Sequence, residues 1–498
     1  MTRCLRPARR ALVLALAAGL LGLAPSSAEA LPPVRHVFTI LLENEDASAT
    51  FGSSTKAPYL AKTLTSQGQL MPNFFAVTHQ SLGNYIALIS GQGSNIDTQA
   101  DCQFFQDVAP GTVGADDQAM GQGCVYPKAM KSIADQLVEK GRTWKGYMED
   151  MGTPCRHPAL NSQDDTQTAE PKDQYAARHN PFVYFHSIID SPLCAQNNVP
   201  LERFPGDLRS SATTADYVFI TPNLCHDAHD EPCVNGEPGG MVSADRFLQT
   251  WIPQIQASAA YREGGLIIIT FDEAETHDAS ACCDEPQFPN TPNNGGPTPG
   301  PGGGRIGGVL LSPFVRGGSV NQTAYNQFSL LRSTEDLFGL GHLGYAARPG
   351  LRAFGSDVFD PGPVSLTRLG VKPGRFRSAK KGVGVARKKR RPLGAAISYS
   401  VSQPATVTFR VQRARAGRRK GRRCVKPRKG RRGKRCVRWV AVPGSFYQQA
   451  LAGENSFRFR GRIAGRRLTA GRYRLLAVAD GYGGASKRGV RGFRVVRR

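Results

Sequence analysis

Three continuous apolar runs rich in β-branched residues stand out in the first 300 residues. They are HVFTILL (36–42), YVFITP (217–222) and LIIITF (266–271). Such runs are typical of strands buried on both faces of a parallel sheet. Two other segments, 126–141 and 327–340, repeat apolar residues at helical spacing. Residues 31–365 are therefore predicted to form an α/β domain, with a mostly parallel sheet flanked by helices.

The pattern changes after about residue 365, where short alternating segments follow one another between glycine-rich turns. They read AAISYSV, ATVTFRV, CVRWVAV, NSFRFRG and GRYRLLAVAD. This pattern predicts a small all-β domain, an immunoglobulin-like antiparallel sandwich, over 391–498. A basic linker is expected over 366–390. Between the second and third segments, 413–436 is predicted to be a cationic hairpin or loop.

The net charge of +25 is divided unevenly along the chain. Residues 366–498 hold 40 Lys and Arg against Glu454 and Asp480, a net charge of +38, which leaves −13 for residues 1–365. Such a basic tail binds polyanions through sequence-independent electrostatics. For an exported protein, an anionic wall polymer or lipid surface is the expected partner, with no specific nucleic acid. A solvated loop without a dedicated ligand is the alternative.

The N-terminus has the pattern of a secretory signal. Four arginines precede the apolar run 11–24, and Ala28-Glu29-Ala30 follows it. We expect a signal peptide over 1–30, cleaved before Leu31, and a protein that is secreted or associated with the cell surface. A short uncleaved membrane anchor is the alternative, although the run is shorter than the roughly 20 residues that a membrane span needs.

The cysteine count agrees with export. Cys4 leaves with the signal, and the ten that remain are an even number, which in a secreted chain favours disulfides over zinc. Two short loops suggest the pairs Cys225 with Cys233 and Cys424 with Cys436. The adjacent residues 282 and 283 are both cysteines, and we expect each to find a separate partner or to stay reduced.

Polar residues follow all three predicted strands of the α/β domain. They are Glu43-Asn44 after the first, Asn223 and then Asp227 and His229 after the second, and Asp272-Glu273 after the third. Ligands collect beyond the carboxyl ends of strands in open α/β sheets. Carboxylate and amide oxygens, with a histidine nearby, predict a divalent metal ion of unknown identity at this edge.

The stretch THQSLGNYIALISG places Ser81 at the start of a predicted helix, where backbone N–H groups and the helix dipole favour an anion. A serine at this place is ordinarily a helix cap. Next to a metal, its hydroxyl can attack phosphorus. A serine hydrolase of the nucleophile-elbow type is disfavoured because the chain has no Gly-x-Ser-x-Gly motif.

From about residue 35 to 347 the chain resembles the bacterial phosphoesterase family of the alkaline phosphatase superfamily. This family includes secreted acid phosphatases, phosphatidylinositol 3-phosphate phosphatases and phospholipases C. The resemblance rests on seven blocks in family order: HVFTILLENEDASATFG, VTHQSLGNYIALISG, YAARHNPFVYF, ITPNLCHDAHD, IIITFDEAE, GGVLLSPFVRGG and YNQFSLLRSTEDLFGLGHLGYA. It implies an alkaline-phosphatase-like fold.

By this resemblance, Glu43 and Asn44 match the first metal ligands of the family, and Asp272 with Glu273 matches the acidic pair that completes the metal site. Ser81 stands where relatives place their nucleophile.

The same resemblance gives Asn84 the role of supporting the phosphoryl group. His79, His179, Asp227 and His229 match polar positions around the phosphate. It implies that one histidine protonates the leaving alkoxide, with His229 preferred and His179 next.

Two positions depart from the family pattern: relatives have Pro where Gly83 stands, and often His where Gln327 stands. The function expected is a secreted, metal-dependent phosphomonoesterase of the acid phosphatase type, working through a phosphoserine and with phosphoinositides as candidate substrates. A phospholipase C-like phosphodiesterase is one alternative. A catalytically weak protein that binds polyanions or the cell wall is another.

Overall fold

The computed structural model describes residues 30–379, 383–386, 393–430 and 433–497. The predicted signal peptide, except for Ala30, and parts of the predicted linker lie outside these residues. Within the described ranges, no helix is both long and apolar enough to cross a bilayer.

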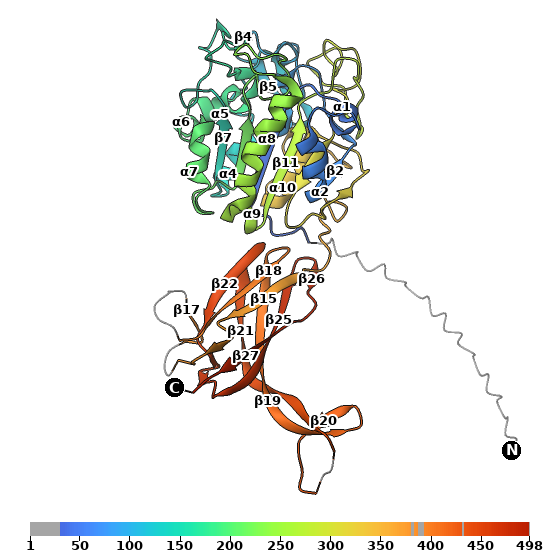
Figure 1. The fold of residues 1–498 in the computed structure, drawn as a ribbon. Coiled ribbons are helices and arrows are strands. Elements are labelled where there is room, and N and C mark those ends of the chain that lie inside the picture. The colour runs from blue at the N-terminus through green and yellow to red at the C-terminus, as the bar shows by residue number, and fades with distance from the viewer. Residues whose placement is uncertain (1–29, 380–382, 387–392, 431–432, 498) are drawn as a thin grey trace, which may run out of the picture. The chain divides into compact units, whose positions relative to one another are not determined.

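The N-terminal part is built on one eight-stranded sheet (Figure 1). Its order is β13 (Ser319–Val320), β2 (Gln69–Met71), β12 (Gly308–Leu311), β11 (Gly265–Phe271), β1 (His36–Leu42), β10 (Tyr217–Thr221), β7 (Trp144–Met148) and β9 (Asn198–Pro200). The five strands from β11 to β9 are parallel, whereas β12 pairs antiparallel with both β11 and β2. The three predicted strands are confirmed as β1, β10 and β11, and all three are buried along their whole length.

Helices flank this sheet (Figure 1). The longer ones are α3 (Ser81–Ser90), α4 (Ile133–Glu139), α8 (Gly240–Ala257) and α10 (Gln327–Phe338). Helix α4 is shorter than predicted because Ser132 and Asp135 form a capping box that starts it there. Helix α10 starts after Asn326, whose side chain accepts from the Ser329 N–H.

Shorter elements complete this part of the chain. They are α1 (Ala47–Phe51), α2 (Thr65–Gln67), α5 (His186–Ile189), α6 (Leu193–Asn197), α7 (Phe204–Asp207), α9 (Ala259–Arg262), and the strand pairs β3 (Phe74–Phe75) with β14 (Tyr325–Asn326), β4 (Phe104–Phe105) with β8 (Ser162–Gln163) and β5 (Ala109–Val113) with β6 (Ala119–Gln122).

The C-terminal part is all β, as predicted. The first sheet has the order β15 (Leu366–Lys372), β18 (Ala395–Val401), β22 (Gly453–Phe459) and β17 (Val385–Ala386). The second has the order β16 (Arg375–Phe376), β27 (Gly489–Val495), β25 (Gly471–Gly481), β19 (Ala405–Lys420) and β20 (Arg423–Val425). In the second sheet, β21 (Arg435–Ala450) also pairs with β19, and β26 (Gly484–Ala485) pairs with β25. A small hairpin pairs β23 (Arg462–Ile463) with β24 (Arg466–Arg467). Ile397 and Phe459 of the first sheet share one apolar core with Phe409 and Leu475 of the second, so the two sheets form a sandwich.

The segment 366–390 does not serve only as a linker. Strand β15 pairs with β18, and β16 pairs with β27. The reason is that Val371 and Phe376 bury their side chains in the core of the sandwich. The apolar cluster of the N-terminal part ends at Phe359 and that of the sandwich begins at Val364. We keep a domain boundary near residue 365 as a proposal.

The cationic segment 413–436 forms part of a β-ribbon. Strand β19 pairs with β21 from Ala405 to Arg418, whereas its pairing with β25 ends at Arg413. Past Arg413, β19 and β21 therefore continue as a ribbon (Figure 1). A disulfide between Cys424 and Cys436 joins the two sides of this ribbon.

All ten cysteines of residues 31–498 are in disulfides. The pairs Cys225–Cys233 and Cys424–Cys436 were expected and are confirmed; the others are Cys102–Cys124, Cys155–Cys194 and Cys282–Cys283. The expectation of separate partners for the last pair was wrong, because the two adjacent residues bond to each other.

Candidate active site

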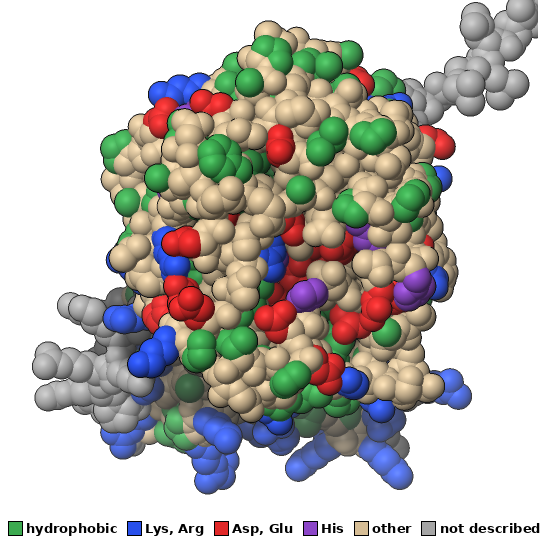
Figure 2. Space-filling model, turned by 90° about the horizontal axis from the view of Figure 1, so that it is seen from above, with side chains coloured by type: hydrophobic (Ala, Val, Ile, Leu, Met, Phe, Trp, Pro, Cys, Tyr) green, Lys and Arg blue, Asp and Glu red, His purple; other side chains and the backbone are tan. Residues whose placement is uncertain are grey.

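The polar residues that follow β1, β10 and β11 meet at one edge of the sheet. These strands are parallel neighbours, so their carboxyl ends lie together. Figure 2 shows acidic and histidine side chains gathered around a hollow on this face.

Glu43, directly after β1, is fully buried. Its Oε2 accepts hydrogen bonds from the Ser81 hydroxyl at 2.8 Å and from Asn44 Nδ2 at 3.2 Å. Its Oε1 accepts from the Tyr85 hydroxyl at 2.5 Å. Burial, together with the nearby carboxylate of Asp272, raises the pKa of Glu43 well above its ordinary value.

Two more buried carboxylates follow the neighbouring strands. Asp272 Oδ1 accepts from the backbone N–H groups of Asn44 and Glu273. Asp227 Oδ1 accepts from the His229 N–H at 3.0 Å. In both aspartates Oδ2 has no hydrogen-bond partner among the described residues. Burial raises the pKa of Asp227 to about 7, and it raises the pKa of Asp272 as well.

His179 lies between two of these acids. Its ring stacks on Tyr85, with centroids 5.3 Å apart, and is 3% exposed. Nε2 is 3.5 Å from Glu43 Oε2, and Nδ1 is 3.5 Å from Asp227 Oδ2. Neither nitrogen forms a hydrogen bond within the described part of the chain. Burial, and to a smaller extent the positive charge of Arg178, lowers the pKa of His179 well below its ordinary value.

This donor set fits a divalent cation. Three buried carboxylates, Glu43, Asp272 and Asp227, repel one another, which is costly unless a positive charge lies among them or protons are bound. The unpartnered Oδ2 of Asp272 is an oxygen ligand of the kind that such ions take, and the unpartnered Oδ2 of Asp227 and the imidazole of His179 lie close to the same acids.

A second group, Cys225, His226 and Glu237, also brings three ligand-type atoms together. It fits a metal poorly, because Cys225 is bonded to Cys233 and has no thiolate to offer. His226 is held instead by Glu149 at 2.9 Å. Burial alone would lower the pKa of His226, but this hydrogen bond raises it to about 9.

Ser81 is the first residue of α3, as the sequence suggested. The residue before it, Gln80, has a φ of 71°, which turns the chain sharply into the helix. The N–H of Leu82 is bonded to Asp101 Oδ1 at 2.9 Å, so this N–H of the helix terminus is already satisfied within the protein.

Both polar atoms of the Asn84 side-chain amide are bonded to backbone groups near Ser81. Its Oδ1 accepts from the Val77 and Thr78 N–H groups, and its Nδ2 donates to the Thr78 and Gln80 carbonyls. The side chain therefore holds the loop that leads into Ser81. Gly83 packs tightly on the same loop: a Cβ there would lie 2.6 Å from Thr78 Cγ2.

His79 and Glu273 are partners. His79 Nδ1 is 2.6 Å from Glu273 Oε2, and its Nε2 is 2.9 Å from the Asp278 carbonyl. Glu273 Oε2 also accepts from the Gln80 N–H. Both ring nitrogens of His79 therefore have partners. Glu273 Oε2 is bonded to His79 and to Gln80.

His229 lies nearer to solvent than His79 and His179, with half of its side chain exposed. Its Nδ1 is 2.8 Å from Asp230 Oδ1, and this hydrogen bond raises the pKa of His229. Nε2 has no partner among the described residues.

Sequence reasoning missed three contributors to the site. Tyr85 was detectable, because it lies four residues after Ser81 and so on the same helix face. Arg178, 3.8 Å from Asp101, gave no signal beyond its place next to His179. Gln327 bonds the Asp272 carbonyl and the Val77 N–H, a link between distant segments.

The fold and this buried cluster of serine, acidic and histidine side chains define an α/β protein with a polar site at the carboxyl ends of its parallel strands. The sequence model of the Phosphoesterase family matches residues 53–341, more than half of the chain, and the chain belongs to this family. The family resemblance is thereby confirmed, and with it the expectation of an enzyme class that acts on phosphate esters.

Two curated relatives show how far the similarity extends. An acid phosphatase of Aspergillus fumigatus is 26% identical over 313 residues, covering 62% of this chain and 55% of that protein. A phosphatidylinositol-3-phosphatase of Mycobacterium tuberculosis is 26% identical over 320 residues, covering 64% of this chain and 82% of that protein. The chain thus spans a little more than half the length of the fungal relative.

Among solved structures, a protein of the alkaline phosphatase superfamily from Vibrio parahaemolyticus overlaps 76% of this chain and 77% of its own. The TM-score is 0.37 and the identity 11%, an overlap that carries no argument about function.

Proposed function

We propose that the chain is a secreted, metal-dependent phosphomonoesterase of the acid phosphatase type that works through a phosphoserine intermediate. One observation carries this proposal: the Ser81 hydroxyl donates to Glu43, a buried carboxylate that lies beside the unpartnered groups of Asp272 and His179. A hydroxyl among carboxylates of this kind has both a proton acceptor and a place for a cation nearby.

Glu43, Asn44 and Asp272 are the residues that we propose would hold the cation, with Glu273 behind them. When bound, a divalent ion would supply positive charge that lowers the pKa of the serine hydroxyl and offsets the charge of the phosphate. Asn44 has a φ of 54°, which lets its backbone N–H reach Asp272.

In the first step, Ser81 Oγ bonds to phosphorus and gives its proton to Glu43 Oε2. The bond from phosphorus to the alkoxide breaks, and His229 Nε2 gives the alkoxide its proton. His229 suits this role because its ring is half exposed. In the second step, water attacks phosphorus, the bond to Ser81 Oγ breaks, and Glu43 returns the proton to Ser81 Oγ. His179, whose Nδ1 lies 3.5 Å from Asp227 Oδ2, accepts the water proton. Arg178 is the buried cation that we propose orients the phosphate oxygens, since its guanidinium lies near these acids.

Secretion is part of the proposal, and the disulfides support it. Five disulfides in one chain favour an oxidising compartment outside the cytoplasm. Phosphoinositides are proposed among the substrates because the mycobacterial relative is named as a phosphatidylinositol-3-phosphatase. The basic sandwich would bring the enzyme to an anionic wall polymer or lipid surface.

The test is turnover of p-nitrophenyl phosphate and of bis(p-nitrophenyl) phosphate by residues 31–498, with and without a chelator and after adding back Mg²⁺, Mn²⁺, Ca²⁺ or Zn²⁺. We expect turnover of the monoester that chelator removes and metal restores. A preference for the diester would replace the phosphatase with a phospholipase C-like phosphodiesterase. Absence of turnover with every metal from acid to alkaline pH would leave a polyanion-binding protein.

A further inference from the structure

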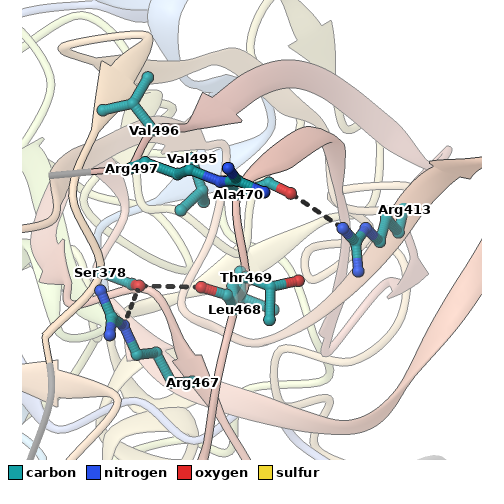
Figure 3. Close-up of a pocket in the computed structure, with 9 residues that line it drawn as sticks. All are labelled: Ser378, Arg413, Arg467, Leu468, Thr469, Ala470, Val495, Val496 and Arg497. Carbon is teal, nitrogen blue, oxygen red and sulfur yellow. Dashed lines mark hydrogen bonds between the residues drawn. The ribbon is translucent and has the colours of Figure 1, made fainter.

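A pocket of about 540 Å³ opens in the C-terminal sandwich, between the turn that joins β24 to β25 and the last residues described (Figure 3). Three arginines from distant parts of the sequence line it: Arg413 of β19, Arg467 of β24 and Arg497. None of the described residues that line the pocket is acidic.

Two of these guanidinium groups are held in place by the protein. Arg413 Nη2 donates to the Ala470 carbonyl at 2.8 Å, and Arg467 Nε donates to Ser378 Oγ at 2.8 Å (Figure 3). The Ser378 hydroxyl in turn donates to the Leu468 carbonyl. Each of these bonds uses one of the five N–H groups of a guanidinium, so others remain for a ligand.

The charge of the pocket is not balanced by the surrounding domain. Only Glu454 and Asp480 are acidic in residues 366–498, and Glu454 pairs with Arg368 at 2.9 Å. Neither acid lines the pocket. Arg497 makes no hydrogen bond or ion pair in the part of the chain that the structure describes. Three cations gathered without a counter-charge among the described lining residues favour an anion between them.

We propose that this pocket binds a phosphorylated polyol, such as an inositol or sugar phosphate. Guanidinium groups bind phosphate oxygens through paired N–H groups. The volume exceeds that of a single phosphate and lies in the range of small-molecule pockets. Thr469 and Val496 also line the pocket, and their hydroxyl and apolar side chains suit the hydroxyls and the carbon ring of such a ligand. This proposal does not rest on the catalytic proposal.

The first experiment is calorimetric titration of residues 31–498 with inositol hexakisphosphate at 150 mM salt. The variant Arg467→Gln/Arg497→Gln is compared with Arg419→Gln/Arg423→Gln, which removes the same charge from the ribbon. We expect one binding event, weakened tenfold or more in the pocket variant and less than threefold in the ribbon variant. Equal weakening in both variants, or no binding by the unaltered chain, would overturn the proposal.

Two further measurements separate binding in the pocket from effects elsewhere in the molecule. The single variant Arg497→Gln repeats the titration without touching a residue that holds the sandwich together, and a weakening below threefold would count against the pocket. Turnover of p-nitrophenyl phosphate should be unchanged in all of these variants, because the pocket is separate from the candidate active site. If the probe inhibits turnover competitively and the pocket variant binds it as well as the unaltered chain, the probe occupies the active site and the proposal fails.

The source of the phosphorylated polyol is decided by sedimentation with vesicles. Phosphatidylcholine vesicles with 5% phosphatidylinositol 4-phosphate are compared with vesicles of equal charge made with phosphatidylserine. If the unaltered chain sediments with the phosphatidylinositol 4-phosphate vesicles and the Arg467→Gln/Arg497→Gln variant does not, the ligand is a lipid head group. Equal behaviour on both, with inositol hexakisphosphate binding intact, identifies a soluble or polymer-borne phosphorylated polyol.

Discussion

The Ser81 hydroxyl and the Glu43 carboxylate form a 2.8 Å hydrogen bond in the protein interior, where both side chains are almost completely buried. If this hydroxyl is the nucleophile, Ser81→Ala should lower kcat for p-nitrophenyl phosphate by several orders of magnitude. The matched control is Ser90→Ala on the same helix, whose buried hydroxyl donates to the Ile86 carbonyl and accepts from the Gln92 N–H. We expect near-normal kcat in the control. A Ser81→Ala enzyme that keeps more than a tenth of its kcat would exclude the phosphoserine mechanism.

Tyr85 is expected to tune Glu43 through the 2.5 Å hydrogen bond between them. Tyr85→Phe removes a bond to a carboxylate, which is worth roughly 1.5–3 kcal/mol, so kcat/KM should fall by about ten- to a hundredfold. Tyr147→Phe removes a partly buried bond to Asp207, a carboxylate that Lys145 also bonds, and should change kcat/KM less than twofold. Steady-state kinetics at saturating metal measure both variants. Equal effects would show a general loss of stability instead of a local role.

Asn84 is expected to act on the loop before Ser81, and not on substrate. Asn84→Ala leaves buried N–H groups of Val77 and Thr78 with fewer acceptors, and should cost about 2–3 kcal/mol in the free energy of unfolding. It should lower kcat through misplacement of Ser81, while KM changes little. Urea unfolding and kinetics are measured together. A raised KM with unchanged stability would return Asn84 to the phosphate-binding role that the family resemblance implies.

These contrasts show what the sequence could predict and what it could not. The strands β1, β10 and β11 were detectable because each is a continuous apolar run, and their parallel pairing brings Glu43, Asp227 and Asp272 to one edge. The roles of side chains were harder to predict. A residue type such as asparagine can bond a phosphate or a backbone equally well, and only the folded loop decides between them.

Two other features depended on contacts between distant segments. Residues 366–376 have a basic composition that suggested a linker, yet their few apolar side chains reach the sandwich core. Arg413, Arg467 and Arg497 are far apart in the sequence and within a generally basic tail, so no local pattern could have indicated that they share a pocket.

Glu335 gives a prediction about stability that is independent of the candidate site. This residue of α10 is completely buried; its Oε1 accepts from the Leu343 N–H at 2.9 Å, and its Oε2 has no partner among the described residues. Burial raises the pKa of Glu335 from 4.5 to about 9.

The sign of the pH effect follows from the two states of Glu335. The unfolded chain ionises this carboxyl above about pH 4.5, whereas the folded chain keeps the proton until about pH 9. Unfolding therefore releases a proton between these values, and stability falls as the pH rises.

Glu335→Gln keeps an acceptor for Leu343 and cannot ionise. It should be nearly neutral at pH 5 and should raise the free energy of unfolding by roughly 4 kcal/mol at pH 8. Guanidinium unfolding at both pH values measures this, with Glu139→Gln as a surface control that alters only the exposed pair with Lys131. The same stability change at both pH values would mean that Glu335 is not held protonated by burial, and that water or an unrecognised partner reaches its Oε2.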